Sequence, residues 1–261
     1  MRRLVVASAL ALLCAGAALA AGDDVIEPDR PDVAFGARTV GRGRVQLETG
    51  LLWSRTRLAG EPTERRLGAE ATLRGGLTER LELRVEGEPI VHLRGDEDVT
   101  DVGDIVVAAK WTFFEPLGES AWPALAFLPF VKLPTAPEPI GTGKTDFGLL
   151  LLATFDLPAQ LTLDVNAGLA AVGQTRPGGH LLQALAAASL SREVVGDVTA
   201  FGELFYGSRE ERKGRDQIGV DAGVVWRVRR DVALDAAVGT SLHGRLPDVS
   251  VRAGGSVRFG R

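Results

Sequence analysis

Residue types that often carry chemistry are scarce in this chain of 261 residues. It has one cysteine, one tyrosine, one methionine and three histidines. The single cysteine, Cys14, lies in a segment that we expect to be removed, which excludes a disulfide framework, a thiolate metal site and a cysteine nucleophile from the mature protein. After residue 22 no run approaches the roughly 18 apolar residues of a membrane-spanning helix, and segments with helical periodicity are hard to find.

The N-terminus has the pattern of a secretory signal peptide. Arg2 and Arg3 precede an apolar run, and Ala18-Leu19-Ala20 is a small-x-small cleavage signal. The alternative, a membrane-anchoring helix, is disfavoured because the run is short and no stop-transfer charges follow it. We therefore expect an exported protein with residues 1–21 removed.

The charge balance is mildly acidic. Removing Arg2 and Arg3 from the 30 basic residues leaves 28 against 34 acidic ones, a net charge near −6. This balance argues against nucleic acid as a partner. The charged and hydrophobic fractions, 25% and 45%, are those of an ordinary soluble protein.

Alternation of apolar and polar residues with a period of two is the dominant pattern. It is clearest in the last hairpin, where two arms of about 11 residues flank the polar tip 243–248. This length is about what a tilted strand needs to cross a bilayer. The pattern predicts twelve strands: 44–54, 67–74, 81–86, 105–113, 124–133, 147–155, 161–171, 181–191, 198–207, 218–228, 232–242 and 249–259.

The connections between these strands alternate in length. Odd connections, including one at 89–104, are long and polar, whereas most even ones are short, such as the expected tight turn at Gly75-Gly76. Bacterial outer-membrane barrels have this asymmetry and an even strand count. Aromatic residues near strand ends fit an aromatic girdle: Trp53, Trp111, Phe113, Trp122, Tyr206, Trp226 and Phe259.

These patterns together predict an all-β fold, a twelve-stranded antiparallel up-and-down transmembrane β-barrel in the bacterial outer membrane. Residues 44–261 would form the barrel among outer-membrane lipids, after an extended N-terminal segment at 22–43. A soluble periplasmic sandwich is the alternative. It is disfavoured because aliphatic side chains cannot easily fill the lumen of twelve strands.

If the apolar strand faces meet lipid, a set of charged side chains points inward. Charges on the lipid side would cost roughly 2–4 kcal/mol for each Arg or Lys near mid-membrane. These residues either form structural ion pairs across the barrel or line a pore and tune its selectivity. They are Glu48, Glu70, Glu82, Arg84, Glu86, Lys110, Asp164, Glu203, Asp221, Arg227, Asp235, Arg252 and Arg258.

Three of the predicted strands, at 124–133, 147–155 and 181–191, are apolar on both faces. One wall of the lumen would then be apolar. We expect either that Val33 and Phe35 of the N-terminal segment pack against this wall, or that an apolar solute moves along it. Substitution Leu151→Asp would test this expectation.

Other motifs in the chain have simpler explanations. Gly141 to Thr145 resembles a phosphate-binding loop but has Glu138 where that motif needs glycine, and no helix follows. The acidic run from Asp96 to Asp104 misses the helix-loop-helix calcium spacing and fits a solvated loop. No serine and histidine share a convincing adjacent-strand position. We therefore expect no catalytic residues, no metal site and no cofactor.

Several short motifs resemble the outer-membrane transporter family named for the meta-pathway of phenol degradation. They include Asp29-Arg-Pro-Asp32, the block from Gly43 to Gly50, the block from Gly103 to Lys110, Leu133-Pro-Thr135, and the ending Ser256-Val-Arg-Phe259. The resemblance covers nearly the whole mature chain in order. It implies an outer-membrane channel, with some members encoded beside aromatic-degradation genes.

The same resemblance bears on partners and alternatives. Barrels of this type end on an aromatic residue that the barrel-assembly machinery reads, whereas here Gly260 and Arg261 follow Phe259. The resemblance implies passive passage of a small-molecule solute, aromatic or otherwise apolar, without catalysis. The alternatives are a plugged structural or adhesive barrel and an outer-membrane lipid hydrolase.

Overall fold

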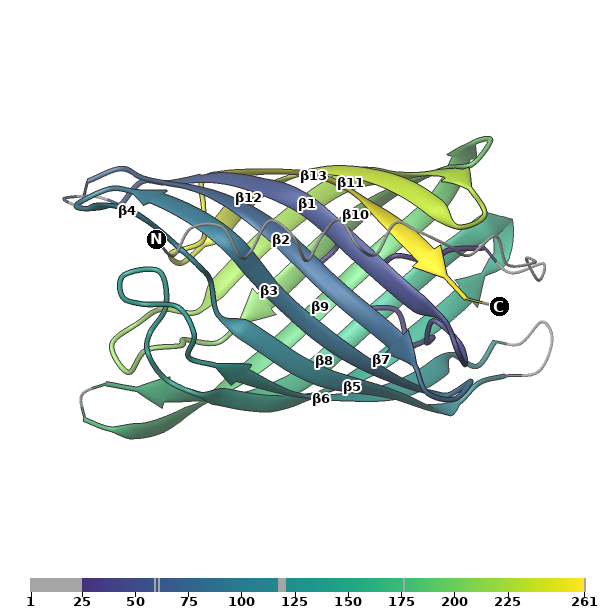
Figure 1. Cartoon of the computed structure of the whole chain (residues 1–261), viewed down its shortest axis with the longest axis horizontal. Coiled ribbons are helices and arrows are strands. Elements are labelled where there is room, and N and C mark those ends of the chain that lie inside the picture. Colours follow the sequence, from purple (N-terminus) through teal and green to yellow (C-terminus); the bar gives the residue numbers. More distant parts are fainter. Residues whose placement is uncertain (1–24, 59, 61, 117–120, 176, 261) are drawn as a thin grey trace, which may run out of the picture.

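The computed structural model describes residues 25–58, 60, 62–116, 121–175 and 177–260. The predicted signal peptide, residues 1–21, lies outside the described residues. Twelve long strands form one closed antiparallel sheet, in which consecutive strands pair and the last strand pairs with the first (Figure 1). The predicted fold class is confirmed.

The twelve strands of the ring have between 10 and 17 residues each. A short strand, β4, lies outside the ring of twelve and pairs only with β3. The strand bounds are β1 Val45–Thr56, β2 Glu64–Gly76, β3 Leu81–Arg94, β4 Asp98–Asp101, β5 Ile105–Phe114, β6 Ala124–Leu133, β7 Asp146–Leu157, β8 Leu161–Gln174, β9 Gly179–Val195, β10 Val198–Gly207, β11 Gln217–Arg229, β12 Val232–His243 and β13 Val249–Phe259.

Two predicted connections are wrong. The stretch 89–104 is mostly strand, because β3 continues to Arg94 and pairs with β4 in a hairpin. Pro89 cannot donate to a regular ladder, but it sits at a register shift between β2 and β3, where the ladder is already interrupted and a missing N–H costs little. Gly75 and Gly76 belong to the end of β2, and the turn comes after them.

The two faces of the sheet are reversed relative to those of a soluble barrel. Leu51, Leu204 and Val238 are each more than half exposed on the outside, whereas Arg74 and Lys110 are fully buried inside. Apolar side chains outside and charges inside are what a bilayer selects. Among the described residues, no helix is long and apolar enough to cross a membrane. The closed sheet, with apolar side chains outside and charges inside, is an outer-membrane barrel.

The barrel has two different ends. Short connections at 77–80, 158–160, 196–197 and 230–231 define what we call the turn end, together with the longer 115–123. The other end carries the longer connections and the β3–β4 hairpin, and we call it the loop end. By the usual asymmetry of such barrels, the turn end faces the periplasm and the loop end faces outward. Several predicted girdle residues are exposed on the outside: Trp53, Trp111, Trp122, Trp226 and Phe259.

Candidate functional site: the N-terminal segment inside the barrel

Residues 25–43, here called the N-terminal segment, lie inside the barrel as an irregular chain (Figure 1). Ile26 and Ala37 are fully buried, and Ala34 and Val40 nearly so. Hydrogen bonds place both ends of the segment at the turn end: the amide of Ile26 donates to the carbonyl of Arg230, and the hydroxyl of Thr39 donates to the carbonyl of Glu79. The segment therefore enters the lumen, turns back and leaves through the same end before β1 begins.

Side chains of the barrel wall bind the backbone at the tip of the segment. The Glu203 carboxylate accepts hydrogen bonds from the amides of Val33 and Ala34, at 2.8 and 2.5 Å. Asn166 accepts from the amide of Phe35 and donates to its carbonyl. A buried backbone without a neighbouring strand needs such partners, because unpaired amides and carbonyls are costly to bury. The only asparagine of the chain thus holds the segment at mid-barrel height.

Asp29 is the electrostatic centre of the segment. Its carboxylate lies 3.0 Å from the Lys110 ammonium and 3.3 Å from the Arg74 guanidinium, and it also accepts a hydrogen bond from Arg84. Arg74 in turn contacts Glu48 at 2.9 Å, so the network reaches the wall of β1. Three cations converging on one buried carboxylate hold the base of the segment, since breaking a buried ion pair leaves an uncompensated charge.

Arg30 holds the segment against the seam between β1 and β13. Its guanidinium contacts Glu70 at 2.5 Å and Asp235 at 3.4 Å. Two glycines that face each other across the seam, Gly50 and Gly254, make room for it. A Cβ atom at Gly50 would lie 2.1 Å from the Arg30 Nη2 atom, so only glycine leaves space there.

The apolar wall is present, and Phe35 packs against it. Phe35 contacts a buried cluster whose members come from β5, β6 and β7 and from the segment itself: Ala37, Ala108, Ala124, Ala126, Leu128, Leu150 and Leu152. The Arg84 guanidinium lies over the Phe35 ring, 4.6 Å from its centroid, in a cation–π contact. The prediction is confirmed for Phe35, whereas Val33 is not part of this cluster.

The substitution Leu151→Asp is not a test of this wall. Leu151 is 41% exposed on the outer face of β7, whereas Leu150 and Leu152 point inward. An aspartate at 151 would therefore meet lipid. Period-two alternation cannot identify the inner residue when both faces of a strand are apolar.

The structure distributes the thirteen predicted inward charges between the segment and the wall. Glu48, Glu70, Glu82, Arg84, Lys110, Glu203 and Asp235 contact the N-terminal segment directly. The remaining charges lie along the wall. Arg252 pairs with Asp221 at 2.8 Å, Arg227 with Glu193, Glu86 with Arg84, and Asp164 accepts from the Thr154 hydroxyl. Arg258 faces the cavity described below.

Two patterns in the sequence could have identified further residues of the site. Arg74 lies on the same alternating face of β2 as Glu70, and Asp29 and Arg30 begin a charged run that resembles a family motif. The pairing of Gly50 with Gly254 becomes visible only once the register across the seam is known.

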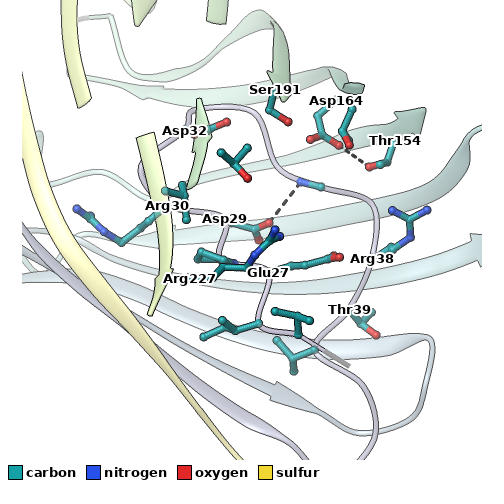
Figure 2. Close-up of a pocket in the computed structure, with 18 of the residues that line it drawn as sticks. Glu27, Asp29, Arg30, Asp32, Arg38, Thr39, Thr154, Asp164, Ser191 and Arg227 are labelled. Carbon is teal, nitrogen blue, oxygen red and sulfur yellow. Dashed lines mark hydrogen bonds between the residues drawn. The ribbon is translucent and has the colours of Figure 1, made fainter. Parts of the chain in front are cut away.

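A cavity of about 650 Å³ opens at the turn end, between the segment and the wall (Figure 2). Its lining is rich in charges of both signs, including Glu27, Asp29 and Arg38 from the segment and Arg227 from β11. Figure 2 shows the segment bordering the cavity, and it shows the hydrogen bond that the Thr154 hydroxyl donates to Asp164. The segment thus forms one wall of this polar recess.

Burial raises the pKa of Asp32 from 3.8 to about 8, and the negative charges of Glu203 and Asp164 act in the same direction. The Ser189 hydroxyl donates to its carboxyl at 2.8 Å. A carboxyl with a raised pKa binds its proton more tightly in the docked segment than in a released one. Asp32 therefore favours docking fully at low pH, and this contribution is lost as pH rises from about 4 towards 8.

We therefore expect the segment to be released more readily at pH 8.5 than at pH 5. Protease cleavage near residue 32 in the folded barrel would measure this release. In Asp32→Asn the side chain stays neutral at every pH, so this part of the pH dependence should disappear. An unchanged pH profile in that variant would contradict the assignment to Asp32.

The other candidate sites show no assembled chemistry. Within the described ranges, no group of three or more His, Cys, Asp or Glu residues could hold a metal ion. His92 contacts Thr100 and Asp98, and His180 lies against the ring of Phe147. None of these contacts pairs a histidine with a serine. The stretch from Gly141 to Thr145 lies in the connection between β6 and β7, as expected.

The chain matches a family model, described as putative MetA-pathway of phenol degradation, over residues 28–259. The chain belongs to this family. The match begins inside the N-terminal segment, one residue before Asp29, so the family pattern includes the segment as well as the barrel. The resemblance inferred from the short motifs is confirmed.

The structure also resembles solved barrels of low sequence identity. One is the COG4313 outer membrane channel from Pseudomonas putida F1, with a TM-score of 0.72 at 13% identity over 90% of this chain and all of that one. Another is the NanC porin, with a TM-score of 0.53 at 9% identity over 82% of this chain and all of that one. A third is the translocator domain of the autotransporter NalP from Neisseria meningitidis, with a TM-score of 0.50 at 15% identity over 84% of this chain and 89% of that one. No curated protein sequence matches the chain.

Proposed function

We propose that this protein is an outer-membrane channel for passive passage of small solutes, and that its N-terminal segment is the gate. The observation that carries the proposal is the segment itself, which fills the lumen through separate side-chain contacts rather than as a strand of the barrel. Because residues 25–43 do not pair as a strand with the wall, we expect the segment to leave the lumen without unfolding the barrel. The structural similarity to the COG4313 outer membrane channel supports this function.

The apolar inner wall and the family description both suggest that the solute is aromatic or otherwise apolar. The inner side of β6 and β7 is apolar where Phe35 packs, and removal of Phe35 would expose that surface to the lumen. An aromatic or other apolar solute could replace the Phe35 ring on this surface, and the family description refers to phenol degradation. Charges on the opposite wall, such as Asp221 and Arg252, would then line the pore and tune its selectivity. Passive passage needs no catalytic group.

A reversible crosslink tests the gate. A Cβ atom at Gly36 would lie 3.9 Å from Thr154 Oγ1, close enough for Gly36→Cys with Thr154→Cys to form a disulfide. Cys14, in the predicted signal peptide, is the only cysteine of the chain, so the pair would be the only thiols of the mature protein. Single-channel conductance in a planar bilayer should be absent in the oxidised variant and return on reduction.

Each single cysteine variant is the matched control, and its conductance should not respond to the reductant. Equal conductance of the oxidised and reduced double variant would contradict gating by the segment. A barrel that inserts and migrates as folded but stays silent in both states would instead support a plugged structural role.

A further inference from the structure

Three arginines form a row across neighbouring strands near the loop end. In the register of the sheet, Arg55 of β1 lies directly opposite Arg65 of β2, and Arg65 lies directly opposite Arg94 of β3. We call these three residues the arginine row. Directly opposed side chains on one face have Cβ atoms about 4.5–5.5 Å apart, and like charges in that arrangement destabilise a sheet.

The row points out of the barrel. Arg55 lies two residues beyond Trp53, and Arg65 lies two residues before Leu67, so each shares the outer face with an exposed apolar side chain. Trp53 and Leu67 are themselves cross-strand partners and form the next row towards the membrane centre. With a rise of about 3.4 Å per residue, the arginine row lies about 7 Å outside that apolar row. A row just outside an aromatic residue of the predicted girdle, such as Trp53, is within reach of the lipid headgroups of the outer leaflet.

The charges of the row are mostly uncompensated. Arg94 contacts Asp98 at 3.3 Å. In the part of the chain that the structure describes, neither Arg55 nor Arg65 has an ion pair or hydrogen bond through its side chain, and the Nε atom of Arg55 is buried without a hydrogen-bond partner. A buried donor without a partner is costly, and directly opposed like charges destabilise a sheet, so an external anion would stabilise this row.

We propose that the arginine row binds the phosphate of an anionic lipid headgroup in the outer leaflet. Guanidinium groups bind phosphate oxygens in pairs of parallel hydrogen bonds, and Arg55 and Arg65 offer adjacent guanidiniums on one face. The acyl chains of the same lipid would lie along Trp53, Leu67 and the apolar belt below them. This site is on the outer surface of the barrel and is independent of the proposed gate.

Native mass spectrometry of the detergent-extracted barrel with bis-phosphorylated lipid A tests the proposal. The double variant Arg55→Gln with Arg65→Gln should bind this lipid roughly 30-fold more weakly than the unmodified chain, because each basic residue near an anionic lipid contributes several-fold in affinity. The unmodified chain should bind dephosphorylated lipid A about as weakly as the double variant does. The variant should still migrate as a folded, heat-modifiable barrel, since it relieves a like-charge contact.

Arg80→Gln is the matched control, because it removes one exposed arginine from the turn end and should leave lipid A binding unchanged. A second variant, Arg55→Lys with Arg65→Lys, keeps the charge and should retain intermediate affinity. Equal binding of phosphorylated lipid A by the unmodified chain and the glutamine variant would overturn the proposal. Inorganic phosphate binding as tightly as the lipid would also overturn it.

Discussion

The substitution Asp29→Asn is expected to open the channel. The neutral amide leaves Lys110, Arg74 and Arg84 facing each other around a position that no longer carries a charge. Removing one partner of a buried ion pair costs about 3–5 kcal/mol, and Arg74 and Arg84 keep other carboxylates, so the lower end of this range applies. A loss of about 3 kcal/mol shifts the ratio of docked to released segment roughly a hundredfold. The open probability in single-channel records should rise accordingly.

Asp156→Asn is the matched control for this experiment. Asp156 also pairs with an arginine of the segment, Arg38, but its side chain is 59% exposed. Exposed ion pairs contribute little, so this variant should conduct as the unmodified chain does. If Asp29→Asn conducts no more than this control does, the network around Asp29 does not hold the gate closed.

The second large effect is expected for Phe35→Ala. Loss of the ring removes the contact of the segment with the apolar cluster and the cation–π contact with Arg84. Truncation of a fully buried phenylalanine costs about 3–5 kcal/mol, and we expect about 2 kcal/mol here because Phe35 is only half-buried. The released fraction should rise roughly 30-fold, and flux of a small aromatic solute should rise with it.

Val33→Ala serves as the comparison, because Val33 is a neighbour of similar exposure that lies outside the cluster. Its backbone amide still donates to Glu203 in the variant. Conductance and flux should change little. Equal effects of the two substitutions would show that the tip of the segment, rather than the apolar wall, determines docking.

The barrel could be predicted from the sequence because its determinants are local. Apolar and polar residues alternate within each strand, so most strands can be recognised from their own residues. The hairpin of β12 and β13, for example, can be predicted almost entirely from its own sequence. The errors fall where local signals conflict. Pro89 favours a loop, but the register shift beside it accommodates a residue without an N–H group.

The position of the N-terminal segment could be predicted only in outline, because its contacts join distant parts of the chain. Glu203 binds residue 33 over a separation of 170 positions, and Asp235 binds Arg30 over 205. The segment has no periodicity of its own, so its sequence indicates only an extended chain. Its apolar residue Phe35 and an apolar inner wall together suggested an interaction, and the three cations around Asp29 became apparent only in the fold.

The position of Arg30 has a consequence for the order of assembly. Its guanidinium occupies the space left by Gly50 and Gly254, on the first and last strands of the barrel, and reaches Asp235 on the strand before the last. This binding site is complete only after β13 has paired with β1. The segment, although it is made before every strand, can therefore reach its final position only when the ring closes. Its docking then links the first and last strands of the barrel, β1 and β13, and stabilises their pairing from the lumen side.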